Sequence, residues 1–210
     1  MNICILMGSP RKNGNTKSLL DPFMAECSRL ENTVKLFWLY DLNIESCVAC
    51  RLCQKDWTRF GCRFDDDLPE IFDCVLACDL LLLATPVYSW YCTAPMKAAL
   101  DRLMYGMNKY YGEEKGPSLW RGKPVAALVT CGYEAEKGAD LLEQGIKRYC
   151  KHSQLHYLGM HSERDLGYKH VFMSEDKAER AAAFARTLLQ AACPPGGQAE
   201  ADGTVSAKPD

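Results

Sequence analysis

Residues 8–18 read Gly-Ser-Pro-Arg-Lys-Asn-Gly-Asn-Thr-Lys-Ser and directly follow the apolar run Ile3–Met7. An apolar strand therefore ends in a loop rich in Gly, Asn and Pro, and Thr16 begins a helical pattern. Such a loop directs backbone N–H groups and hydroxyls at one point, where the positive end of the helix adds to the potential. The stretch predicts a strand–loop–helix unit that suits a phosphate.

The spacing of this loop excludes two widespread phosphate-binding loops. A P-loop would place its second glycine at Asn13, and a Gly-x-Gly-x-x-Gly dinucleotide loop would place one at Pro10. Because neutral donors dominate, with Arg11, Lys12 and Lys17 only at the edges, the loop suits a phosphomonoester. On the loop alone, an ordinary capped turn without a ligand is the alternative.

The bulk composition indicates one globular domain with a sizeable core. The chain has 210 residues, of which 48% are hydrophobic and 25% charged, and its formal net charge is −2. A near-neutral charge provides no basic field for nucleic acid or an anionic membrane. The chain shows no signal-peptide pattern at its start and no run of roughly 20 apolar residues. We expect a cytoplasmic protein without nucleic-acid or membrane partners.

Strand and helix patterns alternate along the chain. Continuous apolar runs such as Asn2–Met7 are typical of parallel strands buried on both faces. Strands are expected at 2–7, 34–39, 80–85, 125–130 and 155–159, and helices at 16–29, 68–78, 94–104, 137–149 and from 174 to about 192. This order predicts an α/β fold, with a five-stranded parallel sheet covered by helices on both faces. The domain is expected to span residues 1–192, followed by a disordered tail at 193–210.

Three loops follow strands of the predicted sheet and carry aromatic or flexible residues. They are Gly8–Thr16, Thr85–Tyr91 and Thr130–Glu134. Ligands of open parallel sheets bind beyond the carboxyl ends of the strands. A phosphate loop beside two aromatic loops suits a flat conjugated ring with a phosphate tail, which describes FMN. The alternative is that these aromatic side chains only close the ends of the core.

The chain resembles the flavodoxin-like NAD(P)H-dependent FMN reductases, a family that includes the iron–sulfur flavoproteins. The resemblance rests on residues 8–16, on Thr85–Tyr88 with Pro95–Arg102, and on Thr130–Gly132, and it covers roughly residues 1–190. It implies a flavodoxin-like three-layer sandwich with strand order 2-1-3-4-5. It also implies bound FMN and a homodimer or homotetramer.

The resemblance further implies which residues surround the FMN. Those around the phosphate are Ser9, Arg11, Asn13, Asn15, Thr16 and Ser18. Those around the ribityl chain and ring are Pro86, Val87, Tyr88 and Ser89, with Thr130, Cys131 and Gly132 approaching the ring.

The chain contains twelve cysteines, and four of them form a compact run. Cys47, Cys50, Cys53 and Cys62 are separated by two, two and eight residues. In iron–sulfur flavoproteins a run of this kind ligates a [4Fe–4S] cluster, although the last gap here is longer than in that pattern. The cluster is therefore a conditional expectation, and a zinc site or no metal are the alternatives.

The function implied by the resemblance is that of an FMN-dependent NAD(P)H oxidoreductase. NAD(P)H would reduce the flavin, and a small-molecule electron acceptor would then use the same site, which gives ping-pong kinetics. No nucleophilic triad or carboxylate pair is present, so we predict no catalytic side chain. The alternatives are an iron–sulfur flavoprotein electron carrier that receives electrons from a ferredoxin, and a flavin-binding structural subunit.

Two long segments without a clear helix or strand pattern, Asn43–Asp67 and Gly106–Gly122, are rich in aromatic residues. We expect these side chains at the surface, where a neighbouring subunit would cover them. The residues concerned are Trp57, Phe60, Tyr110, Tyr111 and Trp120.

Overall fold

The computed structural model describes residues 1–192 and contains one parallel sheet with strand order β2-β1-β3-β4-β5. The strands are β1 (Asn2–Met7), β2 (Thr33–Trp38), β3 (Leu80–Pro86), β4 (Pro124–Cys131) and β5 (His156–Arg164). The predicted fold class and strand order are confirmed. The predicted disordered tail, residues 193–210, lies outside the described residues.

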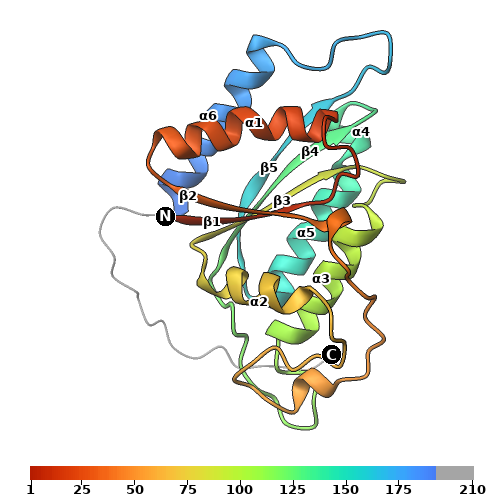
Figure 1. The fold of residues 1–210 in the computed structure, drawn as a ribbon, viewed down its shortest axis with the longest axis vertical. Coiled ribbons are helices and arrows are strands. Elements are labelled where there is room, and N and C mark those ends of the chain that lie inside the picture. The colour runs from red at the N-terminus through yellow and green to blue at the C-terminus, as the bar shows by residue number, and fades with distance from the viewer. Residues whose placement is uncertain (193–210) are drawn as a thin grey trace.

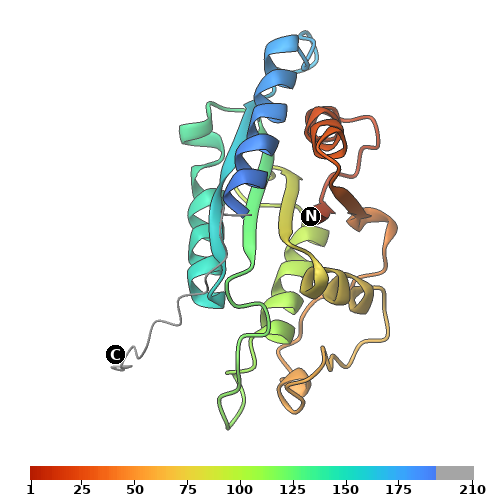
Figure 2. The same ribbon diagram turned by 90° about the vertical axis from the view of Figure 1, so that its left-hand side faces the viewer.

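Helices cover both faces of the sheet, giving three layers (Figure 1, Figure 2). One face carries α1 (Asn15–Arg29) and α6 (Glu175–Ala192), and the other carries α2 (Leu68–Ala77), α3 (Ala94–Met107) and α5 (Asp140–Ser153). The shorter elements are α4 (Ala135–Gly138) and the 3₁₀ turns η1 (Leu39–Asp41) and η2 (Leu52–Gln54).

The central strands contribute side chains to both layers. Ile3 and Ile5 of β1 pack toward α1 and α6, whereas Cys4 and Leu6 belong to the core beneath α2 and α3. All four are fully buried or nearly so. Burial on both faces fixes the register of a strand, since a one-residue slip would exchange its two faces. Because β1, β3 and β4 run parallel, their carboxyl ends lie at the same edge of the sheet.

Two element boundaries differ from the sequence prediction. Gly159 was expected to end the last strand, but β5 continues to Arg164. Gly159 has a φ of +135° and lies beside a register shift opposite Val125 and Ala126, so it accommodates a bulge within the strand. The helix predicted at 137–149 is divided into α4 and α5, because Ala139 leaves the helical conformation between them.

The two long segments pack together below α2 and α3 (Figure 1, Figure 2). The prediction that their aromatic residues lie at the surface is wrong for Phe60 and Trp120, which are 6% and 1% exposed. Phe60 packs on Phe72 with ring centroids 4.8 Å apart. The Trp120 indole N–H donates to Asn108 Oδ1 at 2.8 Å, which satisfies its polar atom inside the core.

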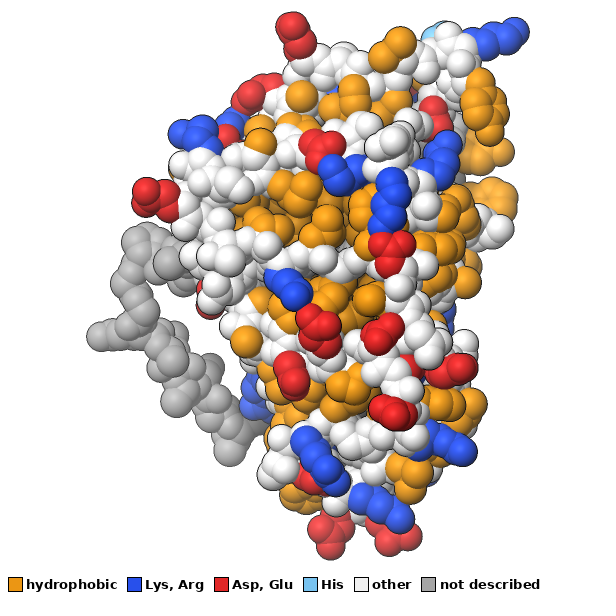
Figure 3. Space-filling model, viewed as in Figure 1, with side chains coloured by type: hydrophobic (Ala, Val, Ile, Leu, Met, Phe, Trp, Pro, Cys, Tyr) orange, Lys and Arg blue, Asp and Glu red, His pale blue; other side chains and the backbone are white. Residues whose placement is uncertain are grey.

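The surface shown in Figure 3 mixes acidic and basic side chains instead of segregating one sign, in line with the small net charge. Within residues 1–192, no helix combines the length and the apolar character that crossing a membrane requires. The predicted cytoplasmic location stays a prediction.

Candidate functional site

The loops after β1, β3 and β4 meet at the carboxyl edge of the sheet. Gly8 lies where the first loop leaves β1, and its N–H donates to the Ala84 carbonyl of β3 at 2.8 Å. The Thr93 hydroxyl donates to the Gly8 carbonyl at 2.7 Å. A Cβ atom on Gly8 would lie 2.9 Å from Thr93 Oγ1 and 3.0 Å from Thr85 Oγ1, so only glycine permits this approach.

The loop after β1 is a tight turn that leads into α1. The Gly14 N–H donates to the Arg11 carbonyl at 3.1 Å, and the Arg11 N–H donates to the Ser9 hydroxyl at 3.2 Å. Helix α1 begins without an acidic residue in its first turn. Its first N–H groups and the positive end of its dipole are therefore available to an anion.

The basic residues of this loop are not equivalent. Lys12 forms an ion pair with Asp41, and its Nζ also lies 3.9 Å from the centroid of the Trp38 ring. Lys12 is thus engaged at the surface between the loop and β2. Arg11 is exposed and lines a hollow together with Asp165, Tyr168 and other residues of the segment after β5.

Thr16 and Thr130 join the first loop to the end of β4. Their hydroxyl oxygens lie 2.7 Å apart, and the residues are 2% and 5% exposed. The Thr130 carbonyl accepts a hydrogen bond from the Val87 N–H at 2.8 Å, which attaches the loop after β3 to the same point. All three predicted loops are therefore connected by hydrogen bonds.

A strained turn follows β3. The backbones of Tyr88 and Tyr91 pair with each other through hydrogen bonds of 2.9 and 3.0 Å. Between them, Ser89 and Trp90 have φ values of +51° and +64°, which is uncommon for residues other than glycine. Strain of this kind is found at functional sites, and here it presents both tyrosines and Trp90 to solvent.

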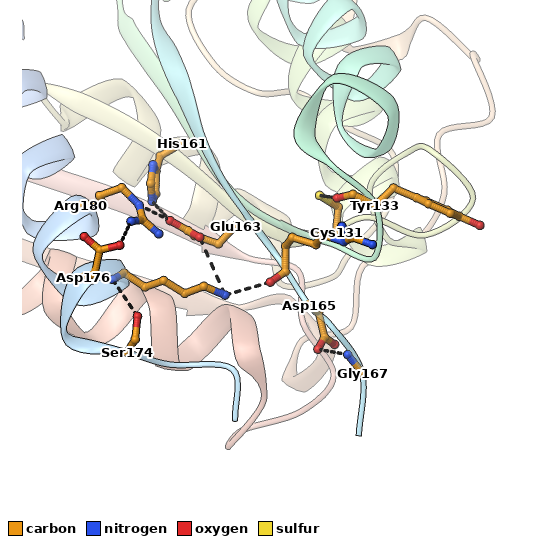
Figure 4. Close-up of polar contacts among 11 residues, drawn as sticks. Cys131, Tyr133, His161, Glu163, Asp165, Gly167, Ser174, Asp176 and Arg180 are labelled. Atoms are coloured by element: carbon orange, nitrogen blue, oxygen red, sulfur yellow. Dashed lines mark hydrogen bonds and ion pairs between the residues drawn. The ribbon is translucent and has the colours of Figure 1, made fainter. Parts of the chain in front are cut away.

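The segment after β4 provides open space beside a buried thiol. Cys131 is 4% exposed, its Sγ contacts the Tyr133 carbonyl at 3.2 Å, and burial raises the pKa of the thiol. A Cβ atom on Gly132 would meet nothing within 4 Å. Figure 4 shows the Tyr133 ring extending away from the sheet.

A cluster of charged residues beside this segment was not found from the sequence. Glu163 on β5 is 7% exposed and accepts a hydrogen bond from Arg180 Nε at 2.7 Å, with His161 Nε2 3.3 Å away (Figure 4). Burial lowers the pKa of His161. The cluster attaches α6 to β5 and so supports the edge of the site. No local motif marks it, because Arg180 lies 17 residues after Glu163 in the sequence.

The sequence-predicted site residues lie along this one edge in three groups. The buried ones are Ser9, Thr16, Thr130 and Cys131, the partly buried ones are Asn15, Ser18, Pro86 and Val87, and the exposed ones are Arg11, Asn13, Tyr88, Ser89 and Gly132. Their arrangement offers hydroxyl and backbone donors at one end and aromatic surface at the other. Their individual contacts with a flavin stay predictions.

The four cysteines of the compact run line one cavity. Cys47, Cys50, Cys53 and Cys62 all line this cavity, which is small, at about 20 Å³. Other residues that line the cavity are Phe60, Phe64, Arg102 and Tyr105. Burial raises the pKa of the Cys53 thiol. The long gap before Cys62 does not prevent the four residues from reaching the same cavity.

The backbone around Cys50 is strained. Ala49 and Arg51 on either side of it have φ values of +51° and +59°. The Cys53 Sγ contacts the Tyr105 carbonyl of α3 at 3.4 Å. Within residues 1–192, no three His, Cys, Asp or Glu side chains converge closely enough to bind one metal ion. A single zinc ion needs thiolates about 2.3 Å from one centre, whereas a cluster spreads its ligands around a larger body.

Two buried cations next to these cysteines were missed by sequence reasoning. Arg102 forms a bidentate ion pair with Asp66, and both side chains are 1% exposed. Lys109 is fully buried and donates to the carbonyls of Cys53 and Arg59 at 2.8 and 2.7 Å. Burial lowers the pKa of Lys109. Their burial could not be read from sequence, because Lys and Arg are rarely fully buried.

Known proteins share this fold and sequence pattern. The family described as NADPH-dependent FMN reductase matches residues 1–158. An iron–sulfur flavoprotein of Archaeoglobus fulgidus is 33% identical over 167 residues, covering 71% of this chain and 74% of that protein.

Two solved structures are similar in fold. An NAD(P)H:quinone oxidoreductase from Methanothermobacter marburgensis has a TM-score of 0.63 and 21% identity, covering 89% of this chain and 95% of that chain. An FMN-dependent NADH-azoreductase from Bacillus anthracis, in complex with FMN, has a TM-score of 0.67 and 13% identity, covering 92% and 100%. At these identities the likeness shows the flavodoxin-like fold. The family match over residues 1–158 and the 33% identical relative show that the chain is an oxidoreductase and belongs to the NADPH-dependent FMN reductase family.

Proposed function

We propose that this protein binds FMN at the carboxyl edge of the sheet and uses it to oxidise NAD(P)H. The observation that carries the proposal is the hydrogen-bonded junction at Thr130, which brings the loops after β1, β3 and β4 to one place. FMN, when bound, supplies a ring that accepts hydride and passes electrons on. The chain binds, orients and shields it.

The residues present fit the phosphate end of FMN. The first turn of α1 carries hydroxyls at Thr16 and Ser18 and contains no carboxylate that would repel an anion. A Cβ atom on Gly14 would lie 2.8 Å from Arg11 Cβ, so the backbone can close tightly only with glycine there. Since Lys12 is engaged with Asp41 and Trp38, neutral donors and the helix end would carry most of the phosphate binding.

The other end of the site fits a flat ring. The space beside Gly132 is open, and exposed aromatic side chains of the loops after β3 and β4 stand at its mouth. NAD(P)H and the electron acceptor would use this mouth in turn. The hollow that Arg11 lines with Tyr168 would meet the nucleotide phosphates of NAD(P)H.

Two measurements test the flavin proposal. Apoprotein titrated with FMN should bind it at micromolar concentrations or tighter, and heat-released supernatant should contain FMN instead of FAD. With NADH or NADPH and a quinone or free flavin as acceptor, double-reciprocal plots should be parallel, as ping-pong kinetics require. Intersecting lines would contradict a shared site, and no oxidation with any acceptor would place the protein among electron carriers.

The four-cysteine cavity favours a second component of the function, a [4Fe–4S] cluster held by Cys47, Cys50, Cys53 and Cys62. Two observations support it: all four residues line one cavity, and the relative that is 33% identical to this chain is an iron–sulfur flavoprotein. Thiolates are the ligands that such clusters use. With a cluster, the protein would also exchange electrons with a ferredoxin-like partner.

Anaerobically purified protein tests the cluster. About four iron atoms per chain and broad absorbance near 400 nm beyond the flavin bands are expected. Cys62→Ser should lower the iron content, whereas Cys92→Ser, a matched change outside the cavity, should not. Flavin bands without iron would contradict the cluster and leave the FMN reductase proposal intact.

We also infer that the protein forms a homodimer or homotetramer through the mouth of the flavin site. Tyr88, Trp90, Tyr91 and Tyr133 are each 47–60% exposed and belong to neighbouring loops. Aromatic residues exposed together are typical of interfaces. Light scattering at tens of micromolar should report an oligomer, and Tyr91→Glu should weaken it. A flavin-bound monomer would contradict this inference.

A further inference from the structure

Arg102 of α3 lines the four-cysteine cavity and contacts one of its sulfurs. The residue is 2% exposed, and its Nη2 donates to Cys62 Sγ at 3.2 Å. Hydrogen bonds from a charged donor are roughly twice as strong as neutral ones. The Cys62 sulfur is therefore held by a permanent positive charge before any other group enters the cavity.

The same guanidinium holds both ends of the cysteine segment. At the start of the segment, Arg102 Nη1 donates to the Glu45 carbonyl at 3.2 Å. At the end of the segment, the guanidinium forms the ion pair with Asp66. Asp66 in turn accepts hydrogen bonds from the backbone N–H groups of Glu45 and Leu68 at 3.0 and 3.3 Å. These contacts fix the position of Cys62 relative to α3.

One donor of Arg102 has no acceptor. Its Nε–H is buried and has no hydrogen-bond partner among the described residues. A buried donor without a partner is destabilising, by about 1–3 kcal/mol. Such a donor is expected beside a site that another group completes.

The positive charge has a direct consequence for a cluster bound here. Four thiolates give a [4Fe–4S] centre a net negative charge, and reduction adds one more electron. The reduction potential of such a centre depends on net charge and on hydrogen bonds to its sulfurs. A cation that donates to a ligand sulfur stabilises the reduced form more than the oxidised form.

We propose that Arg102 is a positioning residue that fixes the Cys62 sulfur and raises the reduction potential of the cluster. The inference rests on the proposed [4Fe–4S] cluster, and it goes beyond it by naming the residue that makes this cluster easier to reduce. Lys109 contrasts with Arg102, because it holds the middle of the same segment through hydrogen bonds to the carbonyls of Cys53, Arg59 and Phe60.

The test compares three variants of the anaerobically purified holoprotein. Arg102→Met combined with Asp66→Asn removes the sulfur contact without leaving a buried carboxylate unpaired. Arg102→Lys keeps the charge and loses the planar fork. Leu103→Ala alters the next residue of α3, which is buried and does not line the cavity. It therefore controls for loss of stability.

The readouts are the midpoint potential of the cluster, the iron content and the rate at which a ferrous chelator removes iron. In the double variant we expect reduction to become about tenfold less favourable, which corresponds to about 59 mV for one electron. Chelator release should accelerate. Arg102→Lys should give a smaller change in potential, and Leu103→Ala should leave the potential unchanged.

Two results would overturn the inference. If the double variant retains the cluster at the wild-type potential, Arg102 serves the fold alone, although the cluster proposal stands. If the wild-type protein contains no iron while it binds FMN and oxidises NAD(P)H, the cluster and the role of Arg102 both fall and the reductase proposal remains. If the double variant does not fold, Arg102→Gln combined with Asp66→Asn, which also removes the charge but keeps polar groups at both positions, decides by the same criterion.

Discussion

The indole of Trp90 and the ring of Tyr133 lie almost parallel, with an interplanar angle of 5° and centroids 6.4 Å apart. Trp90 belongs to the turn after β3, and Tyr133 follows β4, so the pair connects two loops of the candidate flavin mouth. The Trp90 N–H also donates to the Lys137 carbonyl at 3.1 Å, which holds the indole in place. Both rings are about half exposed and present a flat apolar surface to solvent.

We predict that Trp90→Ala weakens the binding of planar substrates. Contacts between aromatic rings contribute about 0.5–1.5 kcal/mol, so the KM for NAD(P)H or a quinone should rise about 2- to 10-fold. Initial-rate kinetics measure the change. Leu30→Ala, which truncates an exposed residue at the far end of α1, should leave KM unaltered. An equal effect of both substitutions would contradict the assigned role of the indole.

Thr16→Val should weaken FMN binding. The substitution keeps the shape of the side chain and removes the hydroxyl that Thr130 contacts at 2.7 Å. Leaving the buried Thr130 hydroxyl without this partner costs about 1–3 kcal/mol of stability and loosens the junction of the first loop with β4, so the dissociation constant should rise by up to about 150-fold. Fluorescence titration with FMN measures it. Thr187→Val on the exposed face of α6 is the matched control and should bind FMN normally.

Gly8→Ala should destabilise the protein, because the added Cβ atom would lie 2.9 Å from Thr93 Oγ1 and 3.2 Å from Met96 Cβ. Overpacking of this kind costs about 1–3 kcal/mol, and each kcal/mol lowers Tm by about 2–4 °C in a protein of this size. Gly145→Ala is the control: its Cβ atom meets nothing within 4 Å inside α5, so the substitution should raise Tm slightly. Thermal unfolding of both variants measures the two changes in Tm.

Glu26 of α1 should contribute to the loss of stability in acid. Hydrogen bonds from Arg29, and then from Arg186 of α6, lower its pKa from 4.5 to about 2. Because the folded state lowers this pKa, the stabilisation is complete above pH 4.5 and disappears as the pH falls toward 2. Denaturant unfolding should therefore show Glu26→Gln less stable than wild type near neutral pH, with the gap closing in acid. A gap that is independent of pH would argue against the ion pairs as its source.

The sequence predicted those parts of the fold that local patterns encode. The apolar runs located β1, β3 and β4 to within one residue at each end, and the family motifs placed the three loops at one edge. The end of β5 was not predictable, because Gly159 has the same sequence signature in a bulge as at a strand end. The pairing of distant strands, which extends β5 to Arg164, depends on the assembled sheet.

Side chains that act across large sequence separations were also beyond local patterns. Sequence patterns indicate no place for Phe60 and Trp120 in a single core. In the fold the two long segments pack together, and both side chains belong to that core. Arg102 was part of a recognised motif, yet its contact with Cys62, 40 residues away, is a tertiary property. The sequence identified the thiols, and only the structure identified the charge beside them.

The hydrogen bonds and the ion pair that tie Glu45 and Asp66 to Arg102 close the cysteine segment through protein contacts alone. In proteins whose metal alone joins the ligand segments, removal of the metal unfolds the site. Here protein contacts close the segment and keep the four cysteines around one cavity, so the fold of the segment would not need an occupant there. If the proposed cluster is present, it would enter a segment that is already folded, and its removal would leave that segment folded.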